Sequence, residues 1–563
     1  MTTVEQVGAE ASPDTSLATA RPDDGEQRPQ PARTDRRQLS TIAIALVALS
    51  PFAVGVSSIV ARGFSAGALF GDRALLALSA GDAWRAPALL GPYSRFYWHH
   101  PGPVYFYVLN VVGSLFGGQT VGLVLAATLV NVAAAGGILL LAHRRGGRPL
   151  LVWASLLLTA YLVAIEPIPF DIWNPSVTLL PFALVLLLAW SVACRDWWMA
   201  PWLALVASFA VQTHVGLVPG VAMALAFAVS VGVWRQRRRE TPLLQEERRS
   251  LRRAAVASTA IAFVVWLPPV IEQFTSREGN LTLLVRFFTR PGSPHPLAAG
   301  LDNTALQATL MLRAVYQPVS LMADAHQGLV LAVVLSVAAY AGAVMLARRA
   351  GATDVVVLLV LVAIELVVGI YAVTRIAGPI QFYLVQWISA VGFVFWLAVG
   401  NACLDFARTR LSDVSWGRTL ARGTAIVVVA AVCIGAIRAF PGDAGRVNEN
   451  LDVPNNRALF GYVPTAQLLA ATRPDRTVVL RLDSVTAWEV MAADALLLVQ
   501  QGRKVQVVES PVTRLLFDDA VLVRTASGSQ VLALRDRPHP HVRAGETLTA
   551  DQGEWSIVNI DPR

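Results

Sequence analysis

Runs of roughly twenty apolar residues recur along most of this 563-residue chain, and each is long enough to cross a lipid bilayer as a helix. Only 15% of the residues are charged, whereas a typical soluble domain has about 25%. A membrane β-barrel would instead show short segments of alternating polarity. The sequence therefore predicts an α-helical protein that crosses the membrane many times.

The formal net charge of +8 comes from arginines that gather in short segments between the apolar runs. Such clusters mark the cytoplasmic ends of membrane helices, so the charge does not indicate nucleic-acid binding. Residues 1–38 are polar and rich in Pro, Asp, Gln and Arg, which predicts a disordered cytoplasmic tail. The abundance of Arg and Ala favours a bacterial plasma membrane as the location.

The stretch LLGPYSRFYWHHPGPVYFYVLN at 89–110 decides the topology. If residues 102–117 crossed the membrane, the basic segments 143–148 and 235–240 would both lie outside, against the preference of Arg for the cytoplasm. The segment is also short for a span, and it begins with Gly and Pro. We therefore expect an amphipathic or re-entrant helix at the outer interface, within one outer loop at 61–118.

This placement predicts about eleven spans in a membrane domain at 39–440, with a second outer loop at 275–326 and the N-terminus in the cytoplasm. Residues 441–563 then lie outside the cytoplasm. They contain two strand-like segments, 476–482 and 504–510, around a helical segment, which predicts a small α/β domain. The spans are expected near 41–60, 119–142, 149–166, 177–194, 200–213, 215–234, 254–274, 327–347, 354–374, 382–402 and 423–440.

Polar side chains near membrane helices are energetically costly and therefore mark candidate functional sites. On this topology, six separate outer turns bring such residues to the outer face. Asp72 is the candidate catalytic residue, with helix capping as its alternative role. Glu365, inside a span, is expected to pair with a neighbouring helix. The candidate substrate-binding residues are Tyr93, Arg95, His99, His100, Asp171, Trp173, Asn174, His214, Glu272 and Arg375.

Most of these candidates also have a structural interpretation. His99 and His100 would complete a turn of interfacial aromatic residues, and His214 would be a packed core side chain. Glu272 follows a pair of prolines that disturb the helix, so capping or packing is its alternative role. A metal site is left open, because scattered Asp, Glu and His side chains bind an ion only if the fold gathers them.

Three short motifs and the layout resemble the GT-C superfamily of membrane glycosyltransferases. This superfamily includes the protein O-mannosyltransferases, the lipid A aminoarabinose transferases and the catalytic subunits of oligosaccharyltransferase. HHPGPVYFYVL is similar to the H/K-P-P-L-Y-Y element of the first outer loop, and Gly71–Asp72 takes the place of its acidic motif. TRIAGPIQFYLVQW at 374–387 is similar to a late R-Y-x-x-P element. The chain departs from the family in having one Asp, not a pair, and Gly102 in place of a proline.

The resemblance implies that the donor is a sugar on a polyprenyl phosphate and that the acceptor is an envelope glycan, lipid or protein at the outer face. Arabinosyl or mannosyl transfer would be typical. Asp72 would take the proton of the acceptor hydroxyl, and Arg375, Arg95 or a protonated His would bind the leaving phosphate. Tyr93, Trp98 and Trp173 would stack on sugar faces.

Two other function classes stay open. A transporter or flippase of lipid-linked envelope precursors would need a polar path through the bilayer, and Glu365 is one of few charges within the spans. A non-catalytic envelope scaffold would recruit partners through the outer domain. The oligomeric state is not predicted.

Overall fold

The computed structural model describes residues 33–411, 431 and 465–560, apart from 63–68, 83–87, 166–167, 240–243, 291, 317–325, 518–520, 525–528, 537–545 and 552–554. The span predicted at 423–440 therefore lies outside the described residues, except for 431, and so does most of the predicted tail. The chain divides between Ala43 and Ile44 into two units, and the contacts below belong to the second.

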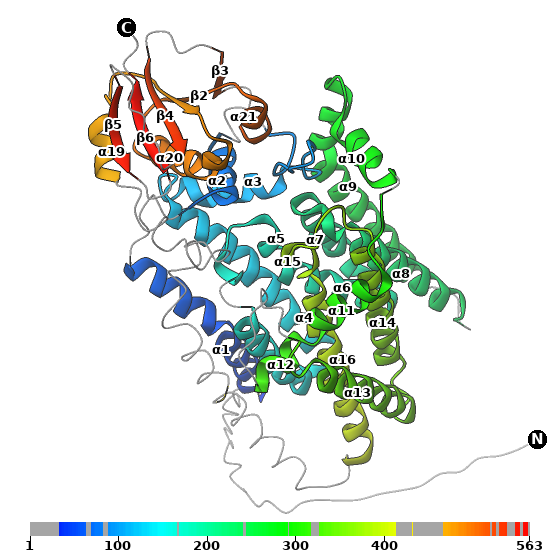
Figure 1. Cartoon of the computed structure of the whole chain (residues 1–563). Coiled ribbons are helices and arrows are strands. Elements are labelled where there is room, and N and C mark those ends of the chain that lie inside the picture. The colour runs from blue at the N-terminus through cyan, green and yellow to red at the C-terminus, as the bar shows by residue number, and fades with distance from the viewer. Residues whose placement is uncertain are drawn as a thin grey trace, which may run out of the picture. The chain divides into compact units, whose positions relative to one another are not determined.

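Eight helices of the described part are long and apolar enough to cross a membrane, so this is a multi-pass helical membrane protein. Figure 1 shows them as the lower, helical part of the molecule. They are α1 (Arg33–Arg62), α4 (Thr120–Ala164), α5 with α6 (Asn174–Val177 and Leu179–Ala193), α8 (Val218–Arg237), α9 (Gln245–Thr275), α13 (Leu329–Arg349), α14 (Thr353–Thr374) and α15 with α16 (Phe382–Val385 and Ile388–Leu411).

The sequence predicts about eleven spans, and three features account for the difference. α7 (Ala200–Thr213) has 14 residues, fewer than a bilayer requires, and the span at 423–440 is outside the described part. α4 contains two predicted spans that meet at Gly147, whose φ of +63° is readily adopted only by glycine. α1 also begins at Arg33, inside the predicted tail.

The two halves of α4 run in opposite directions. Asn131 in the first half donates a hydrogen bond of 2.9 Å to the carbonyl of Pro169, which lies just beyond the second half. In a straight helix of this length the two residues would be separated by roughly 1.5 Å per residue, or more than about 50 Å. The chain therefore reverses at Gly147, as the predicted turn at 143–148 requires.

Helix α6 forms the centre of the helical part. All of its residues are buried, from Leu179 to Ala193, and it contacts α4, α7, α8 and α16. A helix that is apolar on every side must be surrounded by other helices, and α6 fits that pattern.

The two predicted outer loops contain short helices. The first holds α2 (Asp72–Asp82) and α3 (Val104–Ser114), and α3 has 11 residues. At about 1.5 Å per residue α3 is about half as long as the bilayer core is thick, which agrees with a segment that does not cross. The second holds α10 (Asn280–Thr289), α11 (Leu297–Ala308) and α12 (Leu310–Tyr316). Single 3₁₀ turns lie at η2 (Ile168–Phe170), η3 (Trp197–Met199) and η4 (Val215–Leu217).

The C-terminal part is a small α/β domain, as predicted (Figure 1). Its sheet has the order β3-β2-β1-β4-β6-β5, in which the first four strands are parallel and β6 is antiparallel to β4 and β5. The predicted helix is α20 (Trp488–Gln500), preceded by η5 (Val485–Ala487). α20 contacts β1 and β2 of the sheet and α2 of the first outer loop. The other elements are α19 (Thr465–Ala471), α21 (Pro511–Leu516), β1 (Val478–Leu482), β2 (Val505–Val508), β3 (Leu522–Val523), β4 (Gln530–Asp536), β5 (Glu546–Asp551) and β6 (Trp555–Ile560).

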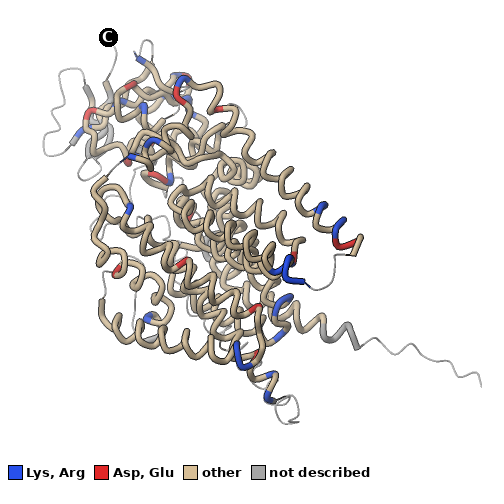
Figure 2. The backbone as a smooth tube through the Cα atoms, turned by 90° about the vertical axis from the view of Figure 1, so that its right-hand side faces the viewer, with Lys and Arg blue, Asp and Glu red and all other residues tan. Residues whose placement is uncertain are grey.

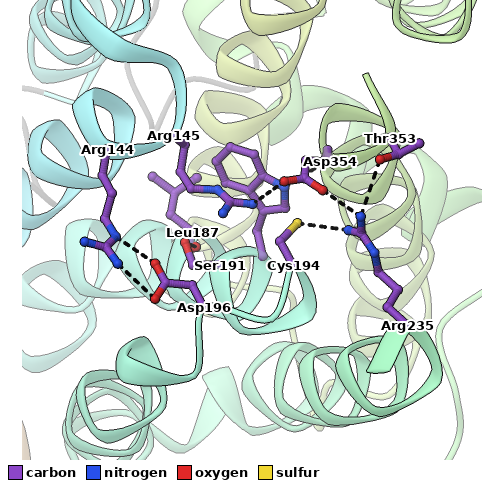
Figure 3. Close-up of polar contacts among 10 residues, drawn as sticks. Arg144, Arg145, Leu187, Ser191, Cys194, Asp196, Arg235, Thr353 and Asp354 are labelled. Carbon is purple, nitrogen blue, oxygen red and sulfur yellow. Dashed lines mark hydrogen bonds and ion pairs between the residues drawn. The ribbon is translucent and has the colours of Figure 1, made fainter. Parts of the chain in front are cut away.

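Basic residues gather at helix ends (Figure 2). Ion pairs connect basic residues of separate turns (Figure 3). Arg144 pairs with Asp196 at 2.7 Å, and both Arg145 and Arg235 pair with Asp354. The turns that the sequence places in the cytoplasm therefore meet at one end of the helices. Which side of the membrane that end faces stays a prediction.

Candidate active site

Asp72 is the first residue of α2 and its carboxylate is half-buried. One oxygen accepts a short hydrogen bond from the hydroxyl of Tyr93, and the other accepts one of 3.1 Å from Nε1 of Trp173. These two donors come from the loop after α2 and from the residue before α5, so three distant segments meet at one carboxylate. Burial, and then the charge of Asp72, raise the pKa of Tyr93, so the phenol stays a donor.

A buried ion pair lies beside Asp72. Arg73 contacts both oxygens of Asp171 at 2.7 Å, with Nε on one and Nη2 on the other. Asp171 is fully buried and also accepts hydrogen bonds from the backbone N–H of Trp173 and the hydroxyl of Ser176. The Arg73 guanidinium lies 5.1 Å from the centre of the Trp173 ring. Asp171 therefore anchors the segment that carries Trp173.

Aromatic side chains from two further segments border this cluster. The ring of Tyr383, on α15, lies 5.1 Å from that of Trp173. The ring of Trp488, the first residue of α20, lies 6.4 Å from that of Tyr93. The carbonyl of Glu489 accepts a hydrogen bond from the N–H of Gly71. The C-terminal domain thus contributes directly to the surroundings of Asp72.

The three candidate histidines form a second cluster. The rings of His100 and His214 lie 5.2 Å apart, and Nδ1 of His100 accepts a hydrogen bond from the N–H of Val215. The backbone of His99 exchanges hydrogen bonds with the side chain of Asn280. Glu272 accepts a hydrogen bond from the N–H of Asn280, so its capping role is observed.

The two clusters are connected through the loop at 89–103. Tyr93 and His99 form an antiparallel bridge within it, and the N–H of His100 donates to the carbonyl of Pro92 at 2.8 Å. Asn174 ties α5 to the same region, since its side chain donates to the carbonyl of Thr213 at 3.0 Å. The loop is a folded unit in which Tyr93 lies opposite His99 and beside the backbone of His100.

Two glycines of this loop lie where the chain packs closely around them. A Cβ at Gly102 would overlap the side-chain amide of Gln212, so that side chain would have to move to make room for one. A Cβ at Gly91 would lie 2.6 Å from the carbonyl oxygen of Gly102 and 2.9 Å from those of His100 and Gln212. The backbone of the loop at Gly91 therefore packs directly against the backbone at the end of α7.

Replacing Gly91 with Ala should lower stability by about 1–3 kcal/mol, because backbone oxygens cannot move aside as a side chain can. Thermal unfolding in detergent measures this loss. Gly136→Ala, inside α4, is the matched control, since nothing lies within 4 Å of the position that its Cβ would take. The packing argument is wrong if both variants unfold at the same temperature as the parent.

The histidine cluster predicts sensitivity to acid. Burial lowers the pKa of His214 to about 4 and also lowers the pKa of His100. An unfolded histidine binds its proton near pH 6.5, so the unfolded state binds more protons below that pH and stability declines toward about pH 4. Between pH 7 and 5, His214→Gln should remove about 1–2 kcal/mol of this decline. Parallel stability curves for variant and parent would contradict the assignment.

Arg95 and Arg375 take no part in the hydrogen bonds described for the two clusters. Each is exposed, and Arg375 ends α14. Nη2 of Arg95 lies 4.0 Å from the position of a Cβ on Gly378, within the segment that follows Arg375. No ion pair is seen for either guanidinium in the described part of the chain. Both are therefore available to an anion on this surface.

Two other expectations have outcomes within the described residues. No three His, Cys, Asp or Glu side chains of this part are grouped so as to hold a metal ion. Glu365 is buried in α14, and neither of its carboxylate oxygens has a hydrogen-bond partner there. Its expected pairing with a neighbouring helix is therefore not seen.

Sequence reasoning missed several residues around Asp72. Arg73 carried a signal, because a cation directly before the apolar run ALLAL is a candidate for burial with an acidic partner. Trp488 and Glu489 carried none, because only the tertiary contact between α20 and α2 brings them to the first outer loop.

Comparisons with known proteins identify the fold. No family model matches the chain, and no curated protein matches it in sequence. The crystal structure of ArnT from Cupriavidus metallidurans bound to undecaprenyl phosphate matches with a TM-score of 0.56 and 13% identity, over 94% of this chain and all of that chain. The apo state of ArnT matches with a TM-score of 0.53 and 14% identity over the same shares. The expected fold is confirmed, because the chain has the same fold as ArnT.

Proposed function

We propose that this protein is a GT-C-type glycosyltransferase that moves a sugar from a polyprenyl-phosphate donor to an envelope glycan, lipid or protein. The observation that carries the proposal is the Asp72 carboxylate, held by Tyr93 and Trp173 where the first outer loop, α5 and the C-terminal domain meet. The ArnT-like fold supports it, since that protein was solved with a polyprenyl phosphate.

The chemistry assigned to Asp72 follows from its hydrogen bonds. A carboxylate has about four acceptor positions, and the two bonds fix its orientation while leaving acceptor positions open. In the proposed step Asp72 takes the proton of the acceptor hydroxyl as that oxygen bonds to the anomeric carbon. The bond from that carbon to the phosphate oxygen breaks, and polyprenyl phosphate leaves with the electron pair.

The other candidates receive different roles in this proposal. Arg95 and Arg375 are the cations assigned to the leaving phosphate, because both are exposed beside the same segment. Tyr93, Trp173 and Tyr383 offer ring surfaces to a sugar. Asp171, Asn174 and Glu272 are positioning residues, since their polar atoms contact the protein's own backbone or Arg73. The histidines His99, His100 and His214 hold the loop at 89–103 in place.

Donor turnover tests the proposal. The full chain, purified and placed in proteoliposomes, is supplied with polyprenyl-phosphate arabinose or polyprenyl-phosphate mannose and an envelope extract as acceptor. We expect mass spectrometry to show release of polyprenyl phosphate that depends on both protein and acceptor. Movement of intact donor between the leaflets, without cleavage, would instead support a flippase and overturn the proposal. The same topology requires the Asp72 end to face away from the cytoplasm, which labelling of a cysteine introduced near Arg95 would check.

A further inference from the structure

The end of the helices remote from Asp72 contains a cavity of about 710 Å³ lined by arginines. Its walls come from the turn after α6, the ends of α8 and α13 and the start of α14. α14 begins at the cavity and has 22 residues, and Tyr383, which borders the Asp72 cluster, follows its other end. At about 1.5 Å per residue the cavity and Asp72 are therefore about 30 Å apart. The volume lies within the range of about 300–1,000 Å³ that is usual for small-molecule sites. The arginines are Arg195, Arg235, Arg238, Arg239 and Arg348.

Only two of these five arginines form a direct ion pair in the described part of the chain, while Glu247 also attracts Arg195 at longer range. Arg235 pairs with Asp354 at 2.8 Å (Figure 3), and Arg239 pairs with Glu247 at 3.1 Å. Arg195, Arg238 and Arg348 form no ion pair in the part of the chain that the structure describes, and no acidic residue of that part lines the cavity. Like charges around one cavity repel one another, and a bound anion would relieve that repulsion.

Arg195 is placed at this cavity at a conformational cost. The N–H of Asp196 donates to the carbonyl of Ser191, and the N–H of Arg195 donates to that of Val192, which is the motif that normally ends a helix with glycine. Arg195 occupies the glycine position with φ 69°. Residues in this strained conformation cluster at functional and ligand-binding sites.

The remaining walls of the cavity are apolar. They include Ala347, Val356 and Val357, and Trp234 is 58% exposed beside them. An exposed Trp at the end of a membrane helix is typical of the lipid–water interface. A soluble phosphate would gain nothing from these walls, whereas the first carbons of an acyl chain would pack on them.

We propose that this cavity binds the phosphate headgroup of an anionic membrane lipid, with the arginines around the phosphate and Val356 and Val357 against the chain. Arg is suited to this role because its planar guanidinium donates two parallel hydrogen bonds to phosphate oxygens. The site is remote from Asp72, so it does not depend on the proposed transferase activity.

The test uses the full chain in nanodiscs of phosphatidylcholine that contain phosphatidylglycerol. Native mass spectrometry counts the phosphatidylglycerol molecules that stay bound after release from the disc. A triple variant with Arg195→Gln, Arg238→Gln and Arg348→Gln should weaken phosphatidylglycerol binding by about tenfold or more. Retention equal to that of the parent would overturn the proposal.

A matched triple variant separates a built site from general charge. Arg249→Gln, Arg252→Gln and Arg253→Gln remove the same charge from exposed positions of α9 that do not line the cavity. We expect this control to weaken binding clearly less than the first triple variant does, because its arginines do not line the cavity. Equal losses in both triple variants would show that the arginines act only as a diffuse positive surface.

A single substitution guards against loss of folding. Arg195→Gly should lower phosphatidylglycerol retention while the unfolding temperature in lipid-free detergent does not fall, because glycine suits the left-handed position. Competition distinguishes the two sources of phosphate. Inorganic phosphate that binds alone as tightly as the lipid, and displaces it, would overturn the lipid assignment.

Discussion

Asp72→Asn is expected to lower the rate of sugar transfer by about 10²–10⁴-fold, the usual contribution of a general base. The substitution keeps the shape of the side chain and removes its ability to take a proton. Both hydrogen bonds survive, because the Asn oxygen accepts from Trp173 Nε1 while its amide donates to the hydroxyl of Tyr93, which also accepts. The folded structure should therefore persist.

The measurement is the turnover number for release of polyprenyl phosphate, together with donor affinity measured separately. The turnover number should fall while donor affinity changes little, because the lost interaction belongs to the reacting proton. Asp475→Asn, at an exposed site of the C-terminal domain, is the control and should behave like the parent. A fully active Asp72→Asn variant would remove Asp72 from the mechanism.

Tyr93→Phe provides a graded comparison at the same carboxylate. It leaves Asp72 able to act as a base and deletes one of the two donors that orient it. The expected loss in rate is about tenfold, smaller than for Asp72→Asn, because one neutral-to-charged hydrogen bond contributes about 1.5–3 kcal/mol at most.

Most of the membrane topology was predictable, because the physical signal is local. Apolar runs and arginine clusters are properties of short segments, and they located α13, α14 and the turn at Gly147. The prediction that the segment within 89–110 does not cross the membrane also came from the positions of the arginine clusters. The short length of α3 agrees with it. The helices α10 to α12 were not predicted. Residues 275–326 were assigned as an outer loop only because they lie between two predicted spans.

The candidate site was predictable only in part, because it depends on contacts between distant segments. Asp72, Tyr93 and Trp173 were each identified from local composition, and they meet as expected. His100 and Arg375 were expected at the same place, yet they belong to a second cluster and an exposed segment. The sequence pattern does not predict which distant segments a loop contacts in the folded protein.

The second large effect concerns stability. Arg73→Ala is expected to destabilise the protein by about 3–5 kcal/mol, because it leaves the buried carboxylate of Asp171 without its cation. Thermal unfolding in detergent gives the measurement. Asp405→Ala is the control, since its pair with Arg408 is partly exposed and should contribute at most about 1 kcal/mol.

A double variant, Arg73→Met with Asp171→Leu, distinguishes charge pairing from lost packing. Replacing both charges with apolar side chains of similar size should recover much of the stability lost in Arg73→Ala, because no uncompensated buried charge remains. Transfer activity should stay low, because the leucine at position 171 cannot accept the hydrogen bond from the N–H of Trp173. That hydrogen bond positions Trp173, whose indole N–H donates to Asp72. Recovery of activity along with stability would show that the pair only supports the fold, and equal instability of double and single variants would contradict the ion-pair argument.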